Sequence, residues 1–370
     1  MTKKSETLIK EFRIVADKFR ARKAGDKMKT LSIIIPSYNT EKHIDRCVPS
    51  FLSIKEQDEL EIIFVNDGST DGTLSKLNSY KKKYPEMIKI ITKQNGGHGS
   101  AVNAGIKEAE GKYFKVVDGD DWVETDGLDR LIRQLRSADA DLVINPFYRV
   151  SQISGNRSLE GVRDIEKNVE IGMDDIPDNI FGLELHTWTI KSSILKENNI
   201  QLTEKCYYDD LEYITFPVPY IKSVLFLDFP VYDYLVDQAA QSVSDANVFK
   251  NYWMNKKIVF SMLRYYSDGE VNWTPRVKRY VMDNTRTAIR QHYNIYLRNR
   301  KEITAYQKLK KFDRELCREF PEVYWGIGKQ YIYIRILRKG KKFTFYIISL
   351  FLGMYKFLYN KSVMVRKLFT

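Results

Sequence analysis

Strand-like and helix-like segments alternate through residues 30–150, and this alternation limits the fold more than any other feature. Runs rich in β-branched and aromatic residues span 31–35, 61–65, 88–92, 113–117 and 141–145, and helix-length segments span 41–54, 70–83, 98–109 and 125–137. Strands alternating with helices are typical of a parallel sheet that is covered by helices. We therefore predict an α/β fold with a mostly parallel central sheet flanked by helices.

Acidic turns follow two of these predicted strands. The first turn reads Asn-Asp-Gly-Ser-Thr-Asp from residue 66, and the second reads Asp-Gly-Asp-Asp from residue 118. Ligands of open α/β sheets bind at the carboxyl ends of the strands, where both turns are expected to lie. Carboxylates there suit a divalent cation, which in turn suits a diphosphate. The alternative is that the second turn only caps the helix after Trp122, because aspartate is a good N-cap.

Four motifs in a fixed order make residues 30–150 resemble the family 2 glycosyltransferases of GT-A fold. The motifs are Pro36-Ser37-Tyr38-Asn39, the acidic turn at 66–71, Asn95-Gly96-Gly97, and Asp118-Gly119-Asp120-Asp121. The resemblance implies the GT-A (nucleotide-diphospho-sugar transferase) fold with a helical C-terminal extension. It also implies inverting transfer of a sugar from a nucleotide-diphospho-sugar, a UDP-sugar in most members, to a glycan or lipid-linked glycan. Synthesis of a cell-surface polysaccharide is the expected setting.

The resemblance also assigns roles on the donor side. It makes Asp120 the ligand of Mn²⁺ or Mg²⁺, which is the implied cofactor. Asp67 is expected to bind the base, and Tyr38 to stack on it. The full set of expected donor-binding residues is Pro36, Tyr38, Asn39, Asp67, Asn95, Gly97, Asn103, Asp118 and Gly119. Backbone amides at the start of the helix after Gly97 are expected to suit a phosphate or a sugar hydroxyl. His98 departs from the commonest family pattern.

The acceptor side is expected later in the chain. Asp209-Asp210 stands where the family has a Glu-Asp pair, so we assign the catalytic base to Asp210, with Asp209 as the alternate. Adjacent carboxylates raise one another's pKa, which helps a base near neutral pH. The alternative is an N-cap pair on the following helix. His186 and Trp188 alternate along a predicted strand and form either an acceptor platform or part of the core.

The expected domains are a catalytic domain over 30–245 and a helical region over 246–370. Within the catalytic domain, residues 30–150 form the donor-binding half and 151–245 the acceptor half. Residues 1–29 have the pattern of a basic amphipathic helix, which would dock on the body, pair with a second copy in a homo-oligomer, or touch a membrane.

The net charge of +12 is concentrated at both ends of the chain. Residues 343–359 are apolar between two basic clusters, but a spanning helix needs about 20 apolar residues. We expect this segment to lie in the interface of an anionic membrane, with a buried helix or an oligomer contact as the alternative. Nucleic acid is not an expected partner. Three scattered cysteines show no zinc spacing, and we expect a cytoplasmic protein, peripheral on the inner face of the cell membrane.

Two other functions compete with glycosyl transfer. A nucleotidyltransferase of related fold would need a glycine-rich basic signature at the end of the first strand, and Pro36-Ser37-Tyr38-Asn39 is not one. A non-catalytic membrane scaffold with a decayed transferase domain would not be expected to keep Asp67, Asp118, Asp120 and Asp210.

Overall fold

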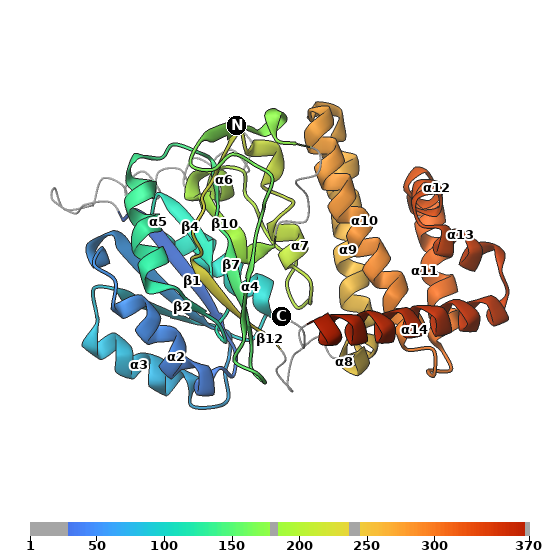
Figure 1. Cartoon of the computed structure of the whole chain (residues 1–370), viewed down its shortest axis with the longest axis horizontal. Helices are drawn as coiled ribbons and strands as arrows, with labels where there is room; N and C mark the ends of the chain where they lie inside the picture. Colours follow the sequence, from blue (N-terminus) through green and yellow to red (C-terminus); the bar gives the residue numbers. More distant parts are fainter. Residues whose placement is uncertain (1–28, 178–183, 237–244, 367–370) are drawn as a thin grey trace, which may run out of the picture.

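The computed structural model describes residues 29–177, 184–236 and 245–366. An α/β unit formed by residues up to 236 lies beside a helical unit that begins at residue 245 (Figure 1). The predicted amphipathic helix over 1–29 lies outside the described residues, apart from Lys29.

The main sheet has eight strands in the order β3-β2-β1-β4-β10-β6-β11-β9. Their bounds are β1 (Leu31–Ser37), β2 (Leu60–Asn66), β3 (Ile88–Thr92), β4 (Tyr113–Val116), β6 (Leu142–Ile144), β9 (Glu170–Gly172), β10 (Trp188–Lys191) and β11 (Ser223–Phe226). Strands β1 to β4 run parallel, and so do β6 and β11, whereas β10 and β9 run antiparallel to their neighbours. The predicted mostly parallel sheet is confirmed, and strands from both predicted halves share it.

A second, four-stranded sheet has the order β5-β12-β7-β8. It comprises β5 (Trp122–Val123), β7 (Phe147–Ser151), β8 (Arg157–Glu160) and β12 (Tyr232–Val236). Because β5 begins directly after Asp121, the second acidic turn connects the two sheets. The sequence did not predict this sheet, since a two-residue strand leaves no periodic signal.

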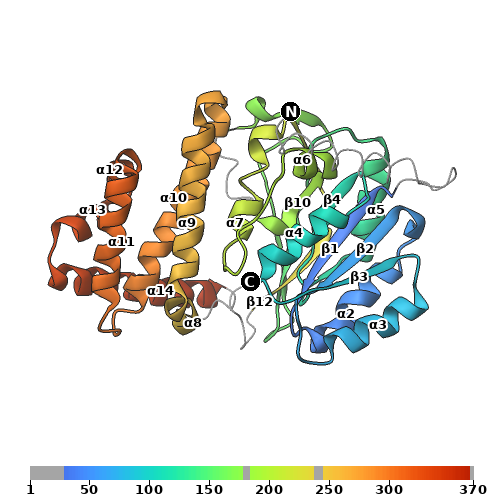
Figure 2. The same cartoon turned by 180° about the vertical axis from the view of Figure 1, so that it is seen from behind.

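Helices cover both faces of the main sheet (Figures 1 and 2). On one face lie α2 (Glu41–Leu52), α3 (Thr73–Lys83) and α5 (Thr125–Ser137), and on the other lie α4 (His98–Glu108) and α6 (Ser192–Glu197). Successive residues of β1 point to opposite faces, so Ile33 and Ile35 join the core under α2 and Ile34 joins the core under α4. A strand buried on both faces is apolar at every position, which is why β1 appears as a continuous run.

Pro36 does not end β1, although proline has no backbone N–H to donate to a neighbouring strand. It lies inside the strand, in register with Val65 of β2. The carbonyl of Ile34 accepts from Val117, so Ile34 and Pro36 direct their backbone polar groups toward β4. Strand β4 ends at Val116, opposite Ile34, so no carbonyl of β4 loses a partner at Pro36.

The helical unit packs on the α/β unit through a shared core. Its helices are α8 (Asp245–Lys250), α9 (Tyr252–Gly269), α10 (Pro275–Arg298), α11 (Ala305–Glu319), α12 (Pro321–Gln330), α13 (Ile332–Lys339) and α14 (Lys342–Arg366). Buried residues of α9 and α10 belong to the same apolar cluster as Ile34 and Trp188 of the main sheet. A buried ion pair between Arg338 and Asp313, 2.8 Å apart, fastens α13 to α11.

Two helical glycines provide a matched test of this packing. A Cβ on Gly105 of α4 would lie 2.3 Å from Cγ2 of Ile34, whereas a Cβ on Gly326 of α12 would meet no atom within 4 Å. We predict that Gly105→Ala lowers the free energy of unfolding by about 1–3 kcal/mol through overpacking. Gly326→Ala should raise it by about 0.5–1 kcal/mol, because alanine is the better helix former. Urea denaturation of both variants checks this, and an undiminished stability of Gly105→Ala would contradict the close contact.

Candidate active site

Asp121 holds the second acidic turn in place. Its buried carboxylate accepts from the hydroxyl of Tyr232 at 2.6 Å and from the backbone N–H of Leu235 at 2.7 Å, both on β12. Burial, together with the charges of Asp120 and Asp118, raises the pKa of Asp121 well above its ordinary value. With Asp121 fixed on β12, Asp118 and Asp120 remain partly exposed at the carboxyl end of β4.

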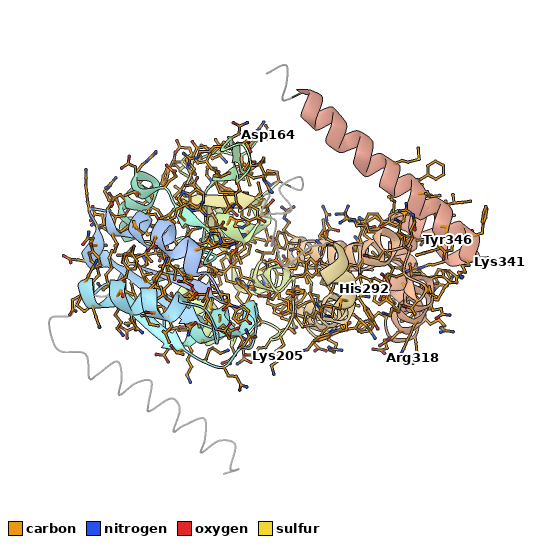
Figure 3. All side chains as sticks on the ribbon, turned by 90° about the horizontal axis from the view of Figure 1, so that it is seen from below. Asp164, Lys205, His292, Arg318, Lys341 and Tyr346 are labelled. Carbon is orange, nitrogen blue, oxygen red and sulfur yellow. The ribbon has the colours of Figure 1, made fainter. Side chains whose placement is uncertain are left out.

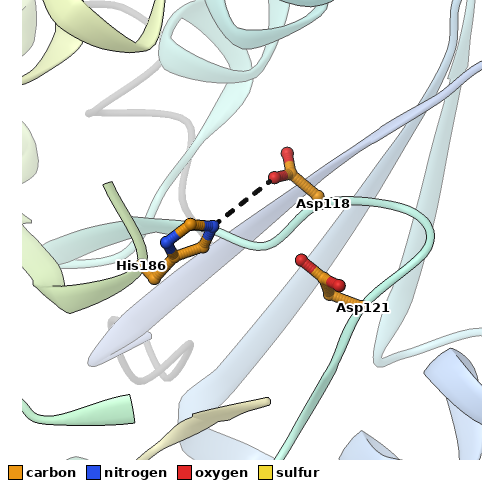
Figure 4. A group of neighbouring side chains, drawn as sticks. All are labelled: Asp118, Asp121 and His186. Atoms are coloured by element: carbon orange, nitrogen blue, oxygen red, sulfur yellow. Dashed lines mark ion pairs between the residues drawn. The ribbon is translucent and has the colours of Figure 1, made fainter. Parts of the chain in front are cut away.

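Asp118, Asp121 and His186 form a group of potential metal ligands (Figure 4). One ligand atom from each lies within 4.8 Å of the others, and Nε2 of His186 is 4.0 Å from Oδ2 of Asp118. Nδ1 of His186 lies 3.3 Å from Oε2 of Glu184, which leaves Nε2 directed toward Asp118, and the ring stacks on Tyr234 with centroids 4.2 Å apart. Carboxylate oxygens with one imidazole nitrogen fit Mn²⁺, and the oxygens also fit Mg²⁺.

Asp120, the predicted metal ligand, is not in this group of three. Its backbone carbonyl accepts from Arg46 at 3.0 Å, and the Arg46 guanidinium lies 4.0 Å over the ring of Trp122. Asp120 lies next to the group in the same turn, and its role as a ligand stays a prediction.

A buried lysine holds the backbone around His186 in place. Nζ of Lys115, on β4, donates to the backbone carbonyls of His186 and Trp188 at 2.8 and 3.2 Å. Burial lowers the pKa of Lys115 to about 7. These bonds fix the 3₁₀ turn at Leu185–Thr187 that carries His186.

Trp188 is a correction to the predicted acceptor platform. The segment around His186 is a 3₁₀ turn rather than a strand, and β10 begins only at Trp188. The two side chains therefore do not alternate onto one face. Trp188 is 1% exposed and packs near Tyr213 in the main core, so of the two residues only His186 faces the acidic turn.

Asp67 anchors the loop before α4. Its carboxylate accepts from the backbone N–H groups of Gly96 and Gly97, at 2.9 and 2.7 Å, and from Nζ of Lys93 at 2.7 Å. Gly97 has φ of 84°, which favours glycine. The amides of Gly96 and Gly97 are thus occupied by Asp67, and the expected phosphate or sugar contact of the amides after Gly97 stays a prediction. The contact of Asp67 with a base stays a prediction.

The end of β1 lies against the second acidic turn. A Cβ on Gly119 would lie 2.6 Å from the backbone oxygen of Pro36, so glycine permits this close approach. Tyr38 is 51% exposed beyond this contact. Asn39 accepts from the backbone N–H of Thr70 at 2.8 Å and so ties β1 to the first acidic turn. The structure therefore brings Pro36, Tyr38, Asn39 and Gly119 to one sheet edge.

Two further expected donor residues lie around α4. Asn95 is exposed, and its backbone N would be 2.9 Å from a Cβ on Gly68. The amide of Asn103 is occupied, because it donates to the carbonyl of Leu202 at 2.9 Å and accepts from the N–H of Leu202 at 2.8 Å. Asn103 thus clamps the loop after α6 to α4, and its expected contact with a donor stays a prediction.

Asp209 and Asp210, the two candidates for the catalytic base, lie at the start of α7 (Asp210–Tyr213). Asp209 is 3% exposed, and its side chain makes no capping hydrogen bond, contrary to the N-cap alternative. Asp210 is exposed to solvent. Desolvation by the surrounding protein and the adjacent charge of Asp209 raise the pKa of Asp210 to about 6. Of the two, Asp210 has the free carboxylate that a base needs.

His98 is the site residue to which the sequence analysis gave no role. Its Nδ1 lies 2.6 Å from Oδ2 of Asp209, and its Nε2 lies 3.1 Å from Oδ1 of Asp118. Burial alone would lower the pKa of His98, but the charges of Asp209 and Asp118 raise it well above its ordinary value. The only sequence signal was the presence of histidine where the family commonly has another residue.

Comparisons with known proteins agree with this geometry. Residues 32–198 match the family model described as glycosyl transferase family 2. Over these residues, which make up less than half of the chain, it is similar to glycosyl transferase family 2. The match covers all four motifs, whereas the acceptor-side carboxylates Asp209 and Asp210 lie beyond residue 198.

Curated relatives of the family 2 domain are bacterial. The chain is 35% identical over 127 residues to glycosyltransferase GlyG of Streptococcus pneumoniae, which is 34% of this chain and 42% of the relative. It is 40% identical over 138 residues to the uncharacterized glycosyltransferase EpsJ of Bacillus subtilis, 35% of this chain and 40% of the relative. A poly(ribitol-phosphate) beta-glucosyltransferase of Bacillus spizizenii is 33% identical over 173 residues, 46% of this chain and 26% of the relative. The chain thus spans less than half of each relative.

The fold extends beyond the family match. S. aureus TarS 1-349, solved in complex with UDP-GlcNAc, superposes with a TM-score of 0.63 at 19% identity and covers 86% of this chain and 89% of that chain. At 19% identity this structural similarity is evidence for the fold alone, and it confirms the predicted GT-A fold. A further structure of S. aureus TarS 1-349 gives a TM-score of 0.59 at 20% identity and covers 86% of this chain and 89% of that chain.

The carboxylates of Asp209 and Asp210 predict that turnover depends on pH. Because Asp210 has a pKa of about 6 and accepts a proton only when ionised, turnover should rise with pH through about 6. Asp210→Asn should lower turnover by about 10² to 10⁴ and remove this rise, while binding of the donor persists. A pH–rate profile with thermal melting as the control for folding checks this. A larger loss in Asp209→Asn, with donor binding retained, would move the base to Asp209.

Proposed function

We propose that the protein transfers a sugar from a nucleotide-diphospho-sugar, most simply a UDP-sugar, to a glycan or lipid-linked glycan with inversion. The observation that carries the proposal is one sheet edge of a family 2 domain. There the turn with Asp118 and Asp120, the imidazole of His186 and the exposed Asp210 lie around a single region. The names of the relatives support an acceptor of the cell-surface polysaccharide class.

The chemistry has three needs, and the described residues are suited to each. The leaving diphosphate must be neutralised, and Asp118, Asp121 and His186, with Asp120 beside them in the same turn, would hold the Mn²⁺ or Mg²⁺ that supplies positive charge there. The acceptor hydroxyl must lose its proton, which Asp210 would take. The hydroxyl oxygen then bonds to the anomeric carbon as the bond to the diphosphate oxygen breaks. One such displacement inverts the anomeric centre.

Nucleotide-sugar binding and turnover test the proposal directly. The purified full chain would be mixed with UDP-GlcNAc, UDP-glucose, UDP-galactose and a dTDP-sugar, with and without Mn²⁺, and its melting temperature measured. At least one donor should raise the melting temperature and release its nucleoside diphosphate slowly. Release of pyrophosphate from UTP would favour the nucleotidyltransferase instead. No effect of any nucleotide would favour the scaffold.

The metal dependence is tested at Asp120. Asp120→Asn removes one anionic ligand, so we predict that divalent-dependent turnover is abolished while the melting temperature without ligand is unchanged. Asp228→Asn is the matched control, because Asp228 is an exposed carboxylate in a surface ion pair with Arg130. Near wild-type turnover of Asp120→Asn at saturating Mn²⁺ would show that Asp118 and His186 suffice.

We also propose that the protein binds an anionic membrane surface through α13 and α14, as residues 343–359 led us to expect. Phe345 and Ser349 of α14 are buried in the helical unit, whereas Phe343, Leu350, Phe351 and Met354 are 50–75% exposed. The exposed apolar positions follow helical spacing and so share one face. Figure 3 shows α14 at the edge of the molecule, with Lys341 near its start.

Charge complements this apolar face. Exposed cations before and at the start of α14 are Arg335, Lys339, Lys341 and Lys342. Each contributes about 1 kcal/mol near an anionic bilayer, and the apolar face adds a share that salt does not weaken. In the described part of the chain, no helix has the length and apolar character needed to cross a membrane. Placement on the inner face of the cell membrane, and a homo-oligomer, stay predictions.

Flotation with vesicles tests the membrane proposal. Deleting residues 340–370 would also uncover the core around Phe345, so the sharper variant changes only Phe343, Leu350, Phe351 and Met354 to serine. We predict that it loses flotation with phosphatidylglycerol vesicles in high salt while donor turnover persists. Ile153→Ser with Ile303→Ser is the control, since both side chains are more than 80% exposed elsewhere. Equal flotation of the serine variant and the wild type would move the contact away from α14.

A further inference from the structure

His98 lies between the two sides of the candidate site. Its imidazole contacts Asp118 of the second acidic turn and Asp209 of the loop that leads to Asp210. Asp209 is separated from His98 by 111 positions in the sequence. An imidazole that bridges two carboxylates does so through both of its ring nitrogens. Within the described ranges, no other side chain forms a hydrogen bond or ion pair with both Asp118 and Asp209.

The loop on the acceptor side is otherwise attached to α4 and the segment before it, to itself, and to α9, where Nζ of Lys257 donates to the carbonyl of Glu204 at 3.2 Å. The backbone N–H of Lys205 donates to the carbonyl of Gly96 at 2.6 Å, and the Asn103 amide holds Leu202. Glu212, which is buried, accepts from the backbone N–H of Thr203 at 2.6 Å. These bonds fix the loop against α4 and α9. None of them joins the loop directly to the acidic turn after β4.

Glycine at position 99 makes the approach of Asp209 feasible. A Cβ there would lie 2.8 Å from the carbonyl oxygen of Thr203 and 3.2 Å from Oδ2 of Asp209. The loop is therefore packed as closely on the start of α4 as a backbone allows. His98, the residue before Gly99, is placed to reach Asp209 on one side and Asp118 on the other.

We propose that His98 is a positioning residue that sets the separation between the donor-side Asp118 and the acceptor-side Asp209–Asp210 turn. The inference rests on the proposed glycosyl transfer and deepens it. Without the bridge, two like charges face each other across the site and repel. The loop would then move, and Asp210 would no longer lie in line with the reacting carbon. A displacement of about 1 Å can cost about 10²-fold in rate.

Chemical rescue distinguishes this role from a merely structural one. His98→Ala should lower kcat by about 10²-fold with little change in the KM for the donor, because the donor residues keep their places. Added imidazole should restore turnover by bridging both carboxylates through its two nitrogens. N-methylimidazole, in which one nitrogen is blocked, can contact only one of them and should not restore it. The same additions to the wild-type chain are the control.

Each outcome has a defined meaning. If the wild-type chain turns over none of the nucleotide-sugars, the proposed glycosyl transfer is overturned, and the His98 proposal that rests on it is overturned too. If the wild type is active, then full activity of His98→Ala, or equal rescue by both imidazoles, overturns the bridge. So does the absence of any rescue in a variant whose melting temperature matches the wild type.

A second pair of variants keeps the test open if His98→Ala does not fold. Asp209→Asn keeps an oxygen that accepts from His98, whereas Asp209→Leu has similar size and no acceptor. The bridge requires that Asp209→Asn retains clearly more of kcat than Asp209→Leu, with similar donor KM in both. Equal losses in the two variants would overturn the proposal.

Discussion

The bonds from Asp121 to β12 are the constraint on which the site depends. The acidic turn after β4 belongs to the main sheet, while Tyr232 and Leu235 belong to the second sheet, and the buried carboxylate joins them. A buried charge is costly unless hydrogen bonds satisfy it, so this joint tolerates few arrangements. With the Asp121 side chain buried against β12, Asp118 and Asp120 remain partly exposed at the sheet edge. Asp121 thus fixes the position of the acidic turn, and with it the positions of Asp118 and Asp120.

Other buried polar groups position the segments that surround the acidic turn. Lys115 holds the turn of His186 through two backbone carbonyls, and Asp67 holds the loop before α4 through two backbone amides. Each of these groups lies within the protein and contacts backbone rather than solvent. Side chains that resembled ligand-binding residues by type are in this way used to position loops. The groups left exposed, Asp210 above all, are the ones free to meet a substrate.

The helical unit contributes differently. The apolar core of this unit is continuous with the core under α4. The helical unit therefore supports the acceptor-side loop and is not a separate appendage of the α/β unit. Residues of α14 divide between that core and solvent, with Phe345 buried and Phe351 exposed on neighbouring turns. A helix that satisfies both a core and an exposed apolar face couples the catalytic unit to whatever surface that face binds. Its mean composition alone does not reveal this division.

The sequence by itself determined the alternation of strands and helices, and with it the sheet and the sheet edge where the motifs meet. Those features depend on local periodicity and on turn residues, which a single chain displays directly. Tertiary structure alone decided the partner of each polar side chain: Leu202 for Asn103, the core for Trp188, and two carboxylates for His98. These partners lie about a hundred residues away or on another sheet. No local pattern encodes them, because they depend on how the elements pack.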